Sequence, residues 1–298
     1  MNPDIVKALE AAGLDPADTD RVVRAALEED FRYGPDVTSS ATVGAVATVT
    51  GDVVARDNGV LAGVPVALAV LDILAETGLA GGGRASGTAL RADGSRIARG
   101  DAVLRVSGPA AAVLSAERTL LNFLTHLSGV ATATRAWADA VAGTGAVVRD
   151  TRKTLPGLRA LQKYAVRCGG GENHRLGLGD AALIKDNHIA AAGGVTKAIE
   201  AVRGAAPDIP LEVECDTLDQ VREALDAGAG FILLDNMSVP DTRSAVAEAR
   251  RHAGVRLEAS GGLSLAGARE VAATGVDYLA VGALTHSVRV LDLGLDFA

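Results

Sequence analysis

The stretch LEVECDTLDQVREALDAGAGFILLDN, residues 211–236, contains the repeating unit that decides the fold. It begins with a strand-like run at Leu211–Cys215, continues into helical spacing of apolar residues at Leu218–Ala227, and returns to an apolar run at Gly230–Asp235. Short apolar runs joined by amphipathic helices are typical of parallel strands that are covered on both faces. The stretch therefore predicts a strand–helix–strand unit of a parallel sheet.

The same unit recurs on both sides of this stretch. The other predicted strands are Val147–Thr151, Ala182–Asp186, Val255–Ser260 and Val276–Gly282. The helices predicted between the strands are Leu158–Cys168, Val195–Arg203, Asp241–Ala253 and Leu265–Thr274. Repeated units of this kind favour a (β/α) barrel over an open doubly wound sheet. Because only six strands are visible where a full barrel has eight, we expect an incomplete barrel.

The chain before the barrel mixes helices and strands and predicts an α+β domain. A long helix from Ser115 to Trp137, with Glu117 in its first turn, should lead into the barrel. The earlier elements are predicted helices at Asp4–Ala12, Thr19–Asp30 and Gly63–Glu76, predicted strands at Ala45–Ala55 and Val103–Val106, and a loop at Gly81–Gly83.

Composition excludes several classes of protein. With 48% hydrophobic residues in 298, the chain can bury a sizeable core. The net charge of −8 argues against nucleic acid or an anionic membrane as the main partner. No apolar run approaches the roughly 20 residues that span a bilayer. The two cysteines, Cys168 and Cys215, lie far apart, which favours a reduced, cytoplasmic setting.

One basic segment stands out in this acidic chain. Residues 149–175 carry seven Lys and Arg residues against two carboxylates, a local charge of 7 − 2 = +5. Such a cluster indicates an anionic ligand, while the alternative is a solvated helix face. Gly169–Gly171, followed by His174 and Arg175, reads either as a flexible loop over a pocket or as a plain linker. His174 and His188 show no zinc-ligand spacing.

Charged residues also follow four successive predicted strands. Because barrel enzymes place their reactive groups at the carboxyl ends of the strands, these residues should meet at one mouth. The cations are Arg152, Lys153 and Lys185, and the carboxylates are Glu214 and Asp235. Cations and carboxylates in one pocket indicate a polyanion that is bound partly by side chains and partly through Mg²⁺.

The last two predicted strands end in glycine-containing turns. Ser260-Gly261-Gly262 and Val281-Gly282-Ala283 allow backbone N–H groups to approach a phosphate, and a following helix N-terminus favours negative charge. The late strands of a barrel are a frequent phosphate site.

At these residues the chain resembles the quinolinate phosphoribosyltransferases. Its motifs occur in the family's order and cover nearly the whole chain. They are Glu117–Asn122, Arg149–Gly157, Gly169–Arg175, Leu183–His188, Glu212–Glu214, Leu234–Asn236 and Glu258–Gly262. The run Tyr33–Thr38 departs from the family pattern, in which glycine more often precedes aspartate directly, but this run includes no proposed catalytic residue.

The resemblance implies a fold and a domain division. The expected fold is an N-terminal α/β sandwich domain followed by an incomplete (β/α) barrel. The sandwich domain would comprise residues 1–117, joined by the C-terminal tail 284–298, and the barrel domain residues 118–283. The working unit would be a homodimer in which each chain lends Arg118 to its partner's pocket, and a hexamer of such dimers stays open.

The resemblance also implies site residues. Lys153, Lys185, Glu214 and Asp235 would be catalytic. The pyridine dicarboxylate and the nearby phosphates would be bound by Arg118, Arg152, Lys153, His174, Arg175 and Lys185. Glu214 and Asp235 would hold the ribose hydroxyls and Mg²⁺, directly or through water. The 5-phosphate would be bound by Ser260, Gly261, Gly262, Val281, Gly282 and Ala283.

The implied reaction belongs to pyridine nucleotide and NAD biosynthesis. Phosphoribosyl pyrophosphate (PRPP) would donate its sugar phosphate to quinolinate, with loss of pyrophosphate and CO₂, giving nicotinate mononucleotide. Two alternatives stay open. One is a diverged homologue of the molybdenum-operon type, which shares the fold without the dicarboxylate pocket. The other is a Schiff-base barrel lyase that uses Lys153 or Lys185 as its nucleophile.

Overall fold

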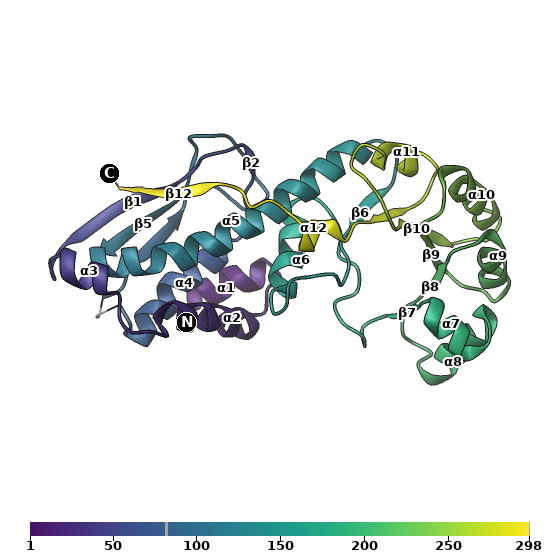
Figure 1. The fold of residues 1–298 in the computed structure, drawn as a ribbon, viewed down its shortest axis with the longest axis horizontal. Coiled ribbons are helices and arrows are strands. Elements are labelled where there is room, and N and C mark those ends of the chain that lie inside the picture. Colours follow the sequence, from purple (N-terminus) through teal and green to yellow (C-terminus); the bar gives the residue numbers. More distant parts are fainter. Residues whose placement is uncertain (81–82, 298) are drawn as a thin grey trace. The chain divides into compact units, whose positions relative to one another are not determined.

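The computed structural model describes residues 1–80 and 83–297 (Figure 1). By contacts the chain divides into two compact units. The first comprises Met1–Arg135, Leu155–Gly170 and Ser287–Ala298, and the second Ala136–Thr154 and Gly171–His286. The domain boundaries expected at residues 117 and 284 stay a prediction, and these units divide the chain elsewhere. The Gly81–Gly83 loop falls mainly on residues 81–82, outside the described residues.

The first unit is built on an antiparallel sheet of order β12-β1-β5-β3. Its strands are β1 (Thr48–Ala55), β3 (Ser86–Ala89), β5 (Ala102–Pro109) and β12 (Leu293–Phe297), and β2 (Gly59–Val60) pairs separately with β4 (Arg96–Ile97). The C-terminal strand β12 pairs with β1, so the chain's end returns to the N-terminal sheet. The α/β architecture expected for this part is confirmed.

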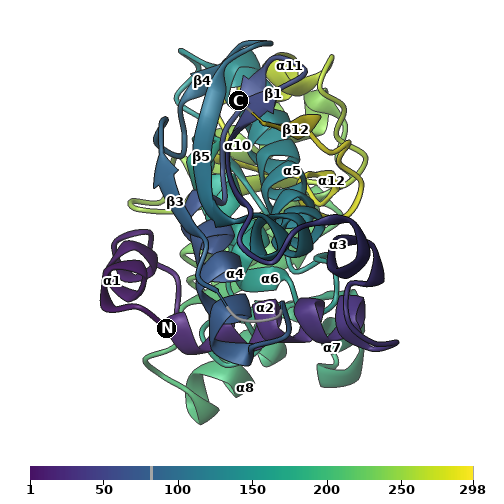
Figure 2. The same ribbon diagram turned by 90° about the vertical axis from the view of Figure 1, so that its left-hand side faces the viewer.

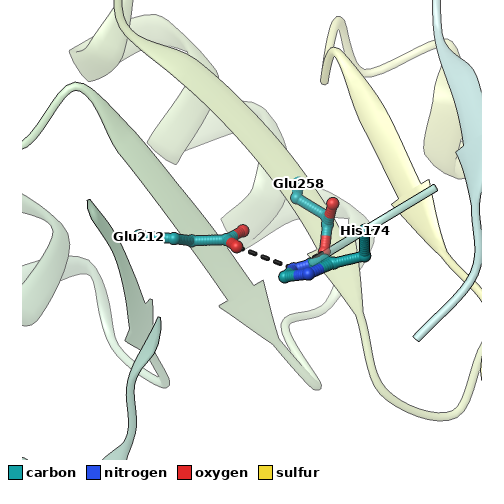
Figure 3. Close-up of side chains that lie close together, drawn as sticks. All are labelled: His174, Glu212 and Glu258. Atoms are coloured by element: carbon teal, nitrogen blue, oxygen red, sulfur yellow. Dashed lines mark ion pairs between the residues drawn. The ribbon is translucent and has the colours of Figure 1, made fainter. Parts of the chain in front are cut away.

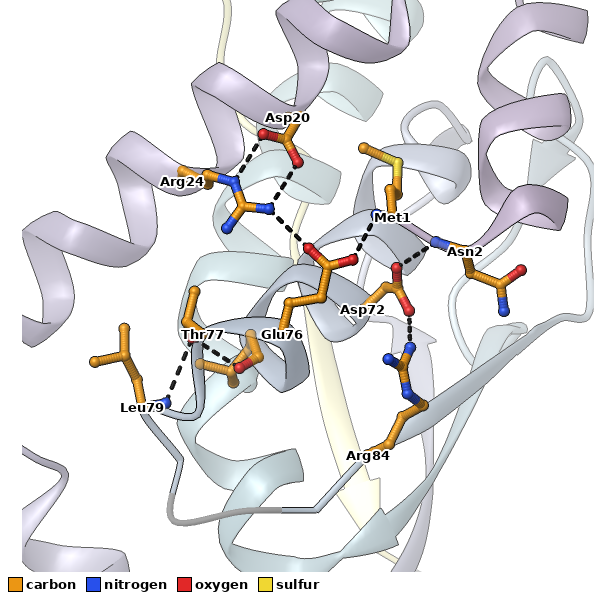
Figure 4. Close-up of polar contacts among 10 residues, drawn as sticks. Met1, Asn2, Asp20, Arg24, Asp72, Glu76, Thr77, Leu79 and Arg84 are labelled. Carbon is orange, nitrogen blue, oxygen red and sulfur yellow. Dashed lines mark hydrogen bonds and ion pairs between the residues drawn. The ribbon is translucent and has the colours of Figure 1, made fainter.

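Helices cover this sheet. They are α1 (Pro3–Ala11), α2 (Pro16–Phe31), α3 (Val37–Thr42) and α4 (Val64–Thr77). The helices α1 and α2 pack on α4, which contacts β3 (Figure 2). The Arg24 guanidinium of α2 lies 2.7 Å from the carboxylate of Asp20 in its own helix and 2.7 Å from that of Glu76 in α4 (Figure 4). Asp72 of α4 accepts a hydrogen bond from the Asn2 backbone N–H at 2.6 Å. These contacts hold the helical layer together.

The long helix α5 spans Ala110–Val141 and begins earlier than the expected Ser115. The run Ala110-Ala111-Ala112 has high helix propensity and directly follows β5, so the helix starts as the strand ends. Consequently Glu117 and Arg118 lie well inside the helix, and the expected placement of Glu117 in its first turn is wrong. The Arg118 side chain is exposed. Helix α6 (Arg159–Cys168) also belongs to the first unit.

The second unit contains a six-stranded parallel sheet of order β6-β11-β10-β9-β8-β7. The strands are β6 (Val147–Arg149), β7 (Ala182–Ile184), β8 (Leu211–Cys215), β9 (Phe231–Asp235), β10 (Arg256–Ser260) and β11 (Tyr278–Ala280). The helices are α7 (Asp186–Ala192), α8 (Val195–Ala205), α9 (Leu218–Asp226), α10 (Val239–Ala249), α11 (Ala268–Ala272) and α12 (Ala283–His286). Strands β6 and β7 form the two edges of the order, which confirms an incomplete barrel.

In this sheet β9 and β10 each begin one residue later than expected, and β6, β7 and β11 are shortened more. Strand β7 ends at Ile184 because Lys185 caps helix α7, and the His188 side chain accepts the Lys185 backbone N–H at 3.0 Å. The short helix α7 was therefore not predicted, because its first residue, Asp186, was assigned to the end of the preceding strand. Within the described residues, no helix is long and apolar enough to cross a membrane.

Candidate active site

A cavity of about 380 Å³ opens at the carboxyl ends of the barrel strands. Side chains alternate along a strand, so residues two apart point to the same side of the barrel. The cavity is lined by Thr151, Arg152, Lys153, His174, Arg175, Leu183, Lys185, Glu214, Leu233, Asp235, Glu258, Ser260 and Ala280. Strand ends that are distant in sequence thus contribute to one site, as the sequence indicated.

Eight of the predicted site residues line this cavity: Arg152, Lys153, His174, Arg175, Lys185, Glu214, Asp235 and Ser260. Gly261 and Gly262 directly follow β10, and Val281, Gly282 and Ala283 directly follow β11. Arg118 belongs to the first compact unit. The structure therefore brings eight predicted residues to one cavity. The predicted turn residues are placed only by their position directly after β10 and β11.

Two guanidinium groups in the wall lack carboxylate partners. Among the described residues, no ion pair reaches Arg152 or Arg175, and the Nε atom of each is buried without a hydrogen bond. Burial lowers the pKa of Arg175, and the positive charge of Arg152 lowers it further. An anion placed between them would relieve this repulsion. The planar fork of arginine suits a carboxylate, which it binds with two parallel hydrogen bonds.

The carboxylates of the cavity lie at the ends of adjacent strands. Glu214 of β8 pairs with Lys185, with 3.0 Å between its Oε2 and the lysine Nζ. Asp235 of β9 accepts a hydrogen bond from the Asn236 side-chain amide at 2.6 Å. Both carboxylates are partly exposed to the cavity, where they present oxygen atoms to a ligand's hydroxyl groups or to a hard cation.

The turn after β10 requires glycine. Gly261 has φ +81°, and a Cβ atom there would lie 2.3 Å from Oδ1 of Asn236. Gly262 has φ +58°, and Asn236 itself has φ 52°, in the left-handed region. A Cβ atom on Gly282 would lie 2.9 Å from Cδ of Lys153. These close approaches leave no room for a Cβ atom at Gly261 or Gly282, in the turns where a phosphate is expected.

The two turns differ in the helix that follows. Helix α12 begins at Ala283, directly after Gly282, but α11 begins only at Ala268. The expected helix start at Leu265 is wrong, because the Ser264 hydroxyl first accepts the Gly267 N–H at 3.2 Å and closes a separate turn. A helix N-terminus therefore does not directly follow Ser260-Gly261-Gly262, whose contribution is its own backbone.

A buried charged network lies at the cavity's floor (Figure 3). His174 Nε2 lies 2.8 Å from Oε2 of Glu212 and 3.5 Å from Oε1 of Glu258. Arg149 donates from Nη1 to Glu258 Oε2 at 2.8 Å, and its guanidinium lies over the Tyr278 ring at 4.6 Å from the centroid. Barrel interiors are usually packed with branched apolar residues, so this charged layer is unusual.

Burial governs the charge of this network. Removal from water raises the pKa of Glu212 to about 7, and it raises the pKa of Glu258 to about 7 with a further contribution from the negative charge of Glu212. Near neutral pH the two carboxyls therefore hold a proton for part of the time. The only full positive charge that contacts either carboxylate, within the described part of the chain, is that of Arg149.

The three groups have the composition of a metal site, since ligand atoms of His174, Glu212 and Glu258 lie within 4.8 Å of one another. The hydrogen bonds argue otherwise. His174 Nδ1 accepts the Arg175 backbone N–H at 2.7 Å, so the ring proton must sit on Nε2, the atom a metal would need. Oε2 of Glu258 already accepts a hydrogen bond from the Arg149 guanidinium. The group is therefore a hydrogen-bonded network, not a metal centre.

Sequence reasoning found only one member of this network as a site residue. His174 was expected in the pocket. Arg149, Glu212 and Glu258 belong to the quoted motifs, but no role in the site was predicted for them. A signal was present: Glu258 lies between Leu257 and Ala259 in a predicted buried strand, and a glutamate there is costly to bury unless it has a partner.

Comparison with known proteins accords with this site. The family model for the N-terminal domain of quinolinate phosphoribosyl transferase matches residues 36–128, and the model for the C-terminal domain matches residues 130–296. A nicotinate-nucleotide pyrophosphorylase (carboxylating) of Mycobacterium leprae is 58% identical over 276 residues, which cover 92% of this chain and 95% of the relative. A probable one of Bacillus subtilis is 41% identical over 90% of this chain and 89% of its own.

Solved structures agree. The nicotinate-nucleotide pyrophosphorylase of Francisella tularensis superposes with a TM-score of 0.89 at 36% identity, over 96% of this chain and 98% of that one. NadC of Streptococcus pyogenes superposes with a TM-score of 0.87 at 37% identity, over 96% and 99% of the two chains. With both domain models matched in order and relatives aligned over nearly their full length, this chain belongs to the quinolinate phosphoribosyltransferase family.

Proposed function

We propose that this chain is a decarboxylating quinolinate phosphoribosyltransferase, a pentosyltransferase of NAD biosynthesis. It transfers the phosphoribosyl group of PRPP to quinolinate and releases pyrophosphate and CO₂, giving nicotinate mononucleotide. The observation that carries this proposal is the pair of guanidiniums without an ion-pair partner among the described residues, those of Arg152 and Arg175, in the same cavity as Glu214 and Asp235. The names of the relatives that cover nearly the whole chain support it.

The two substrates use different parts of the cavity. Arg152 and Arg175, with His174 beside them, bind the two carboxylates of quinolinate. Lys153 and Lys185 face the pyrophosphate, and the backbone of the turns at Ser260–Gly262 and Val281–Ala283 holds the 5-phosphate. Glu214 and Asp235 hold the ribose hydroxyls.

Mg²⁺ fits the same carboxylates. Glu214 and Asp235 offer hard oxygen atoms to one cavity, and Mg²⁺ commonly binds through one or two carboxylates together with waters and substrate phosphates. These residues would hold the ion directly or through water. When bound, it supplies positive charge that neutralises the departing pyrophosphate.

The residues of the chain then support two chemical steps. When the bond between C1 and pyrophosphate breaks, Lys153 and Lys185 stabilise the departing negative charge, and the carboxylates stabilise the positive sugar. The pyridine nitrogen attacks C1. The alkylated ring is cationic and accepts the electron pair of the adjacent C–CO₂ bond, so CO₂ leaves and a proton takes its place.

The alternatives fit the cavity less well. A Schiff-base lysine needs apolar enclosure, but Lys185 is held by Glu214 and Lys153 is exposed. A diverged homologue of the molybdenum-operon type has no need for a dicarboxylate site, whereas this chain keeps Arg118, Arg152 and Arg175. The free thiols of Cys168 and Cys215 accord with the cytoplasmic location that we propose.

The proposal includes a homodimer in which Arg118 acts in the partner's cavity. Among the described residues, no carboxylate pairs with Arg118, which is exposed on α5. An isologous dimer would use each such arginine once, in trans. Assembly of dimers into a hexamer is compatible with the proposal but is not part of it.

The substrate assignment can be tested by comparing quinolinate with nicotinate. We expect loss of the ultraviolet absorbance of quinolinate when PRPP and Mg²⁺ are both present. Nicotinate lacks one carboxylate, which leaves an arginine of the cavity unpaired, so its kcat/KM should be lower by about 10³-fold or more. Equal rates with the two acids would refute the assignment.

A further inference from the structure

A buried network lies at the floor of the cavity. Its members are His174, Glu212 and Glu258 (Figure 3), together with Arg149, which donates to Glu258. Two members, His174 and Glu258, also line the cavity, and the side chain of His174 is only 8% exposed. Glu212 and Glu258 come from the middle of two different strands and approach the imidazole from the barrel interior. The His174 imidazole is therefore held by Glu212 of β8 and Glu258 of β10, two side chains whose backbones belong to strands of the sheet.

The hydrogen bonds specify one tautomer of His174. Its Nδ1 accepts the Arg175 backbone N–H, so Nε2 carries the proton and donates it to Glu212 at 2.8 Å. The other tautomer would place N–H against N–H at the Arg175 bond and two lone pairs against each other at Glu212. Each mismatch leaves a polar group without its hydrogen bond, which disfavours this tautomer.

The same bonds hold the backbone that carries Arg175. The His174 backbone N–H donates to Asp150 Oδ1 at 2.9 Å, and Asp150 is fully buried next to the end of β6. From there the Arg175 guanidinium donates to the Ala181 carbonyl at 3.0 Å while its Nε stays without a partner. The imidazole thus fixes the Arg175 backbone from which this guanidinium extends, because the Arg175 backbone N–H donates to His174 Nδ1.

We propose that Glu212, supported by the Arg149–Glu258 pair, is a positioning residue that holds His174 in the Nε2–H tautomer and thereby aims Arg175 at the dicarboxylate. The proposal rests on the proposed function, since it concerns the residues that position Arg175 for binding quinolinate. Glu212 does not line the cavity, so it reaches the substrate through its hydrogen bond to His174 and through the effect of its charge on Arg175. Arg149 fixes the second carboxylate, whose remaining oxygen lies 3.5 Å from the same imidazole nitrogen.

Two substitutions at one position separate a hydrogen-bond role from a charge role. Glu212→Gln removes the negative charge but keeps an oxygen that accepts the Nε2–H, whereas Glu212→Ala removes both. We expect Glu212→Ala to raise KM for quinolinate about tenfold, with a smaller change in kcat and little change in KM for PRPP. Glu212→Gln should restore most of the quinolinate affinity. Asp219→Ala, which removes an exposed acid on α9, is the matched control.

A second readout reports on the imidazole and does not depend on turnover. The full-length protein is labelled with ¹⁵N-histidine, and the His174 ring is assigned by comparison with His174→Gln. Long-range ¹H–¹⁵N spectra should show the pure Nε2–H tautomer in the wild type and in Glu212→Gln, and a tautomer mixture in Glu212→Ala.

The outcomes are separable. An Nδ1–H tautomer or a mixture in the wild type would overturn the proposal without any variant, even if Glu212→Ala fails to fold. An unchanged tautomer in a folded Glu212→Ala protein, or a Glu212→Gln protein as impaired as Glu212→Ala, would overturn it as well. If wild-type protein failed to convert quinolinate at all, the proposed function would fall, and the ¹⁵N spectra would still decide the tautomer.

Discussion

Arg152→Ala is expected to lower kcat/KM for quinolinate by at least about 100-fold, mainly through a higher KM. Arg152 is half-buried in the cavity wall, and a bidentate bond to a carboxylate contributes about 3 kcal/mol or more. Removing it leaves one substrate carboxylate facing only Arg175. Arg152→Lys should recover little, because an ammonium cannot form the planar fork.

Steady-state kinetics with quinolinate and PRPP varied separately provide the measurement. Arg222→Ala is the control, because Arg222 is an exposed arginine of the same compact unit that pairs with Asp219 on α9. Its kinetics should match the wild type. A KM for quinolinate that stays unchanged in Arg152→Ala would exclude this arginine from the dicarboxylate site.

Arg118→Ala and Lys185→Ala proteins are each expected to be nearly inactive, yet to complement one another when refolded together. If Arg118 acts in the partner's cavity, the mixed dimer contains one cavity with both defects and one with neither. A random mixture is half heterodimer, each with one intact site of two, so activity should approach about one quarter of wild type.

The control for complementation pairs two defects from one cavity. Lys185 and Glu214 contact each other, so a Lys185→Ala and Glu214→Ala heterodimer has one damaged residue in every site and should stay inactive. Analytical ultracentrifugation would verify that dimers form. Heterodimers of Arg118→Ala with Lys185→Ala that show no recovery would mean that Arg118 acts in its own chain's site or in none.

The barrel was predictable because its signal is local. Strand-like runs such as Leu211–Cys215, followed by helical spacing, identify parallel strands from adjacent residues alone, and the charged residues at their ends then converge by geometry. Element ends were less predictable, since they depend on single hydrogen bonds. The helix that begins at Asp186 replaced a strand end because the His188 side chain accepts the Lys185 N–H.

The buried network lay beyond sequence reasoning for a different reason. Glu212 and Glu258 are 46 residues apart by their numbers, 258 − 212, and they meet only because β8 and β10 both flank β9. Their partner His174 comes from a loop that read equally well as a linker. Contacts of this kind follow from strand order, and strand order is not encoded in the periodicity of any one segment.

The central claim is that one active site couples phosphoribosyl transfer to decarboxylation. The most direct test uses quinolinate labelled with ¹³C in the carboxyl group next to the ring nitrogen, together with PRPP, Mg²⁺ and the wild-type protein, followed by NMR. We expect one labelled CO₂ to be released for each nicotinate mononucleotide formed, with no label in the nucleotide. Label retained in a mononucleotide, or quinolinate left unchanged by active, folded protein, would contradict it.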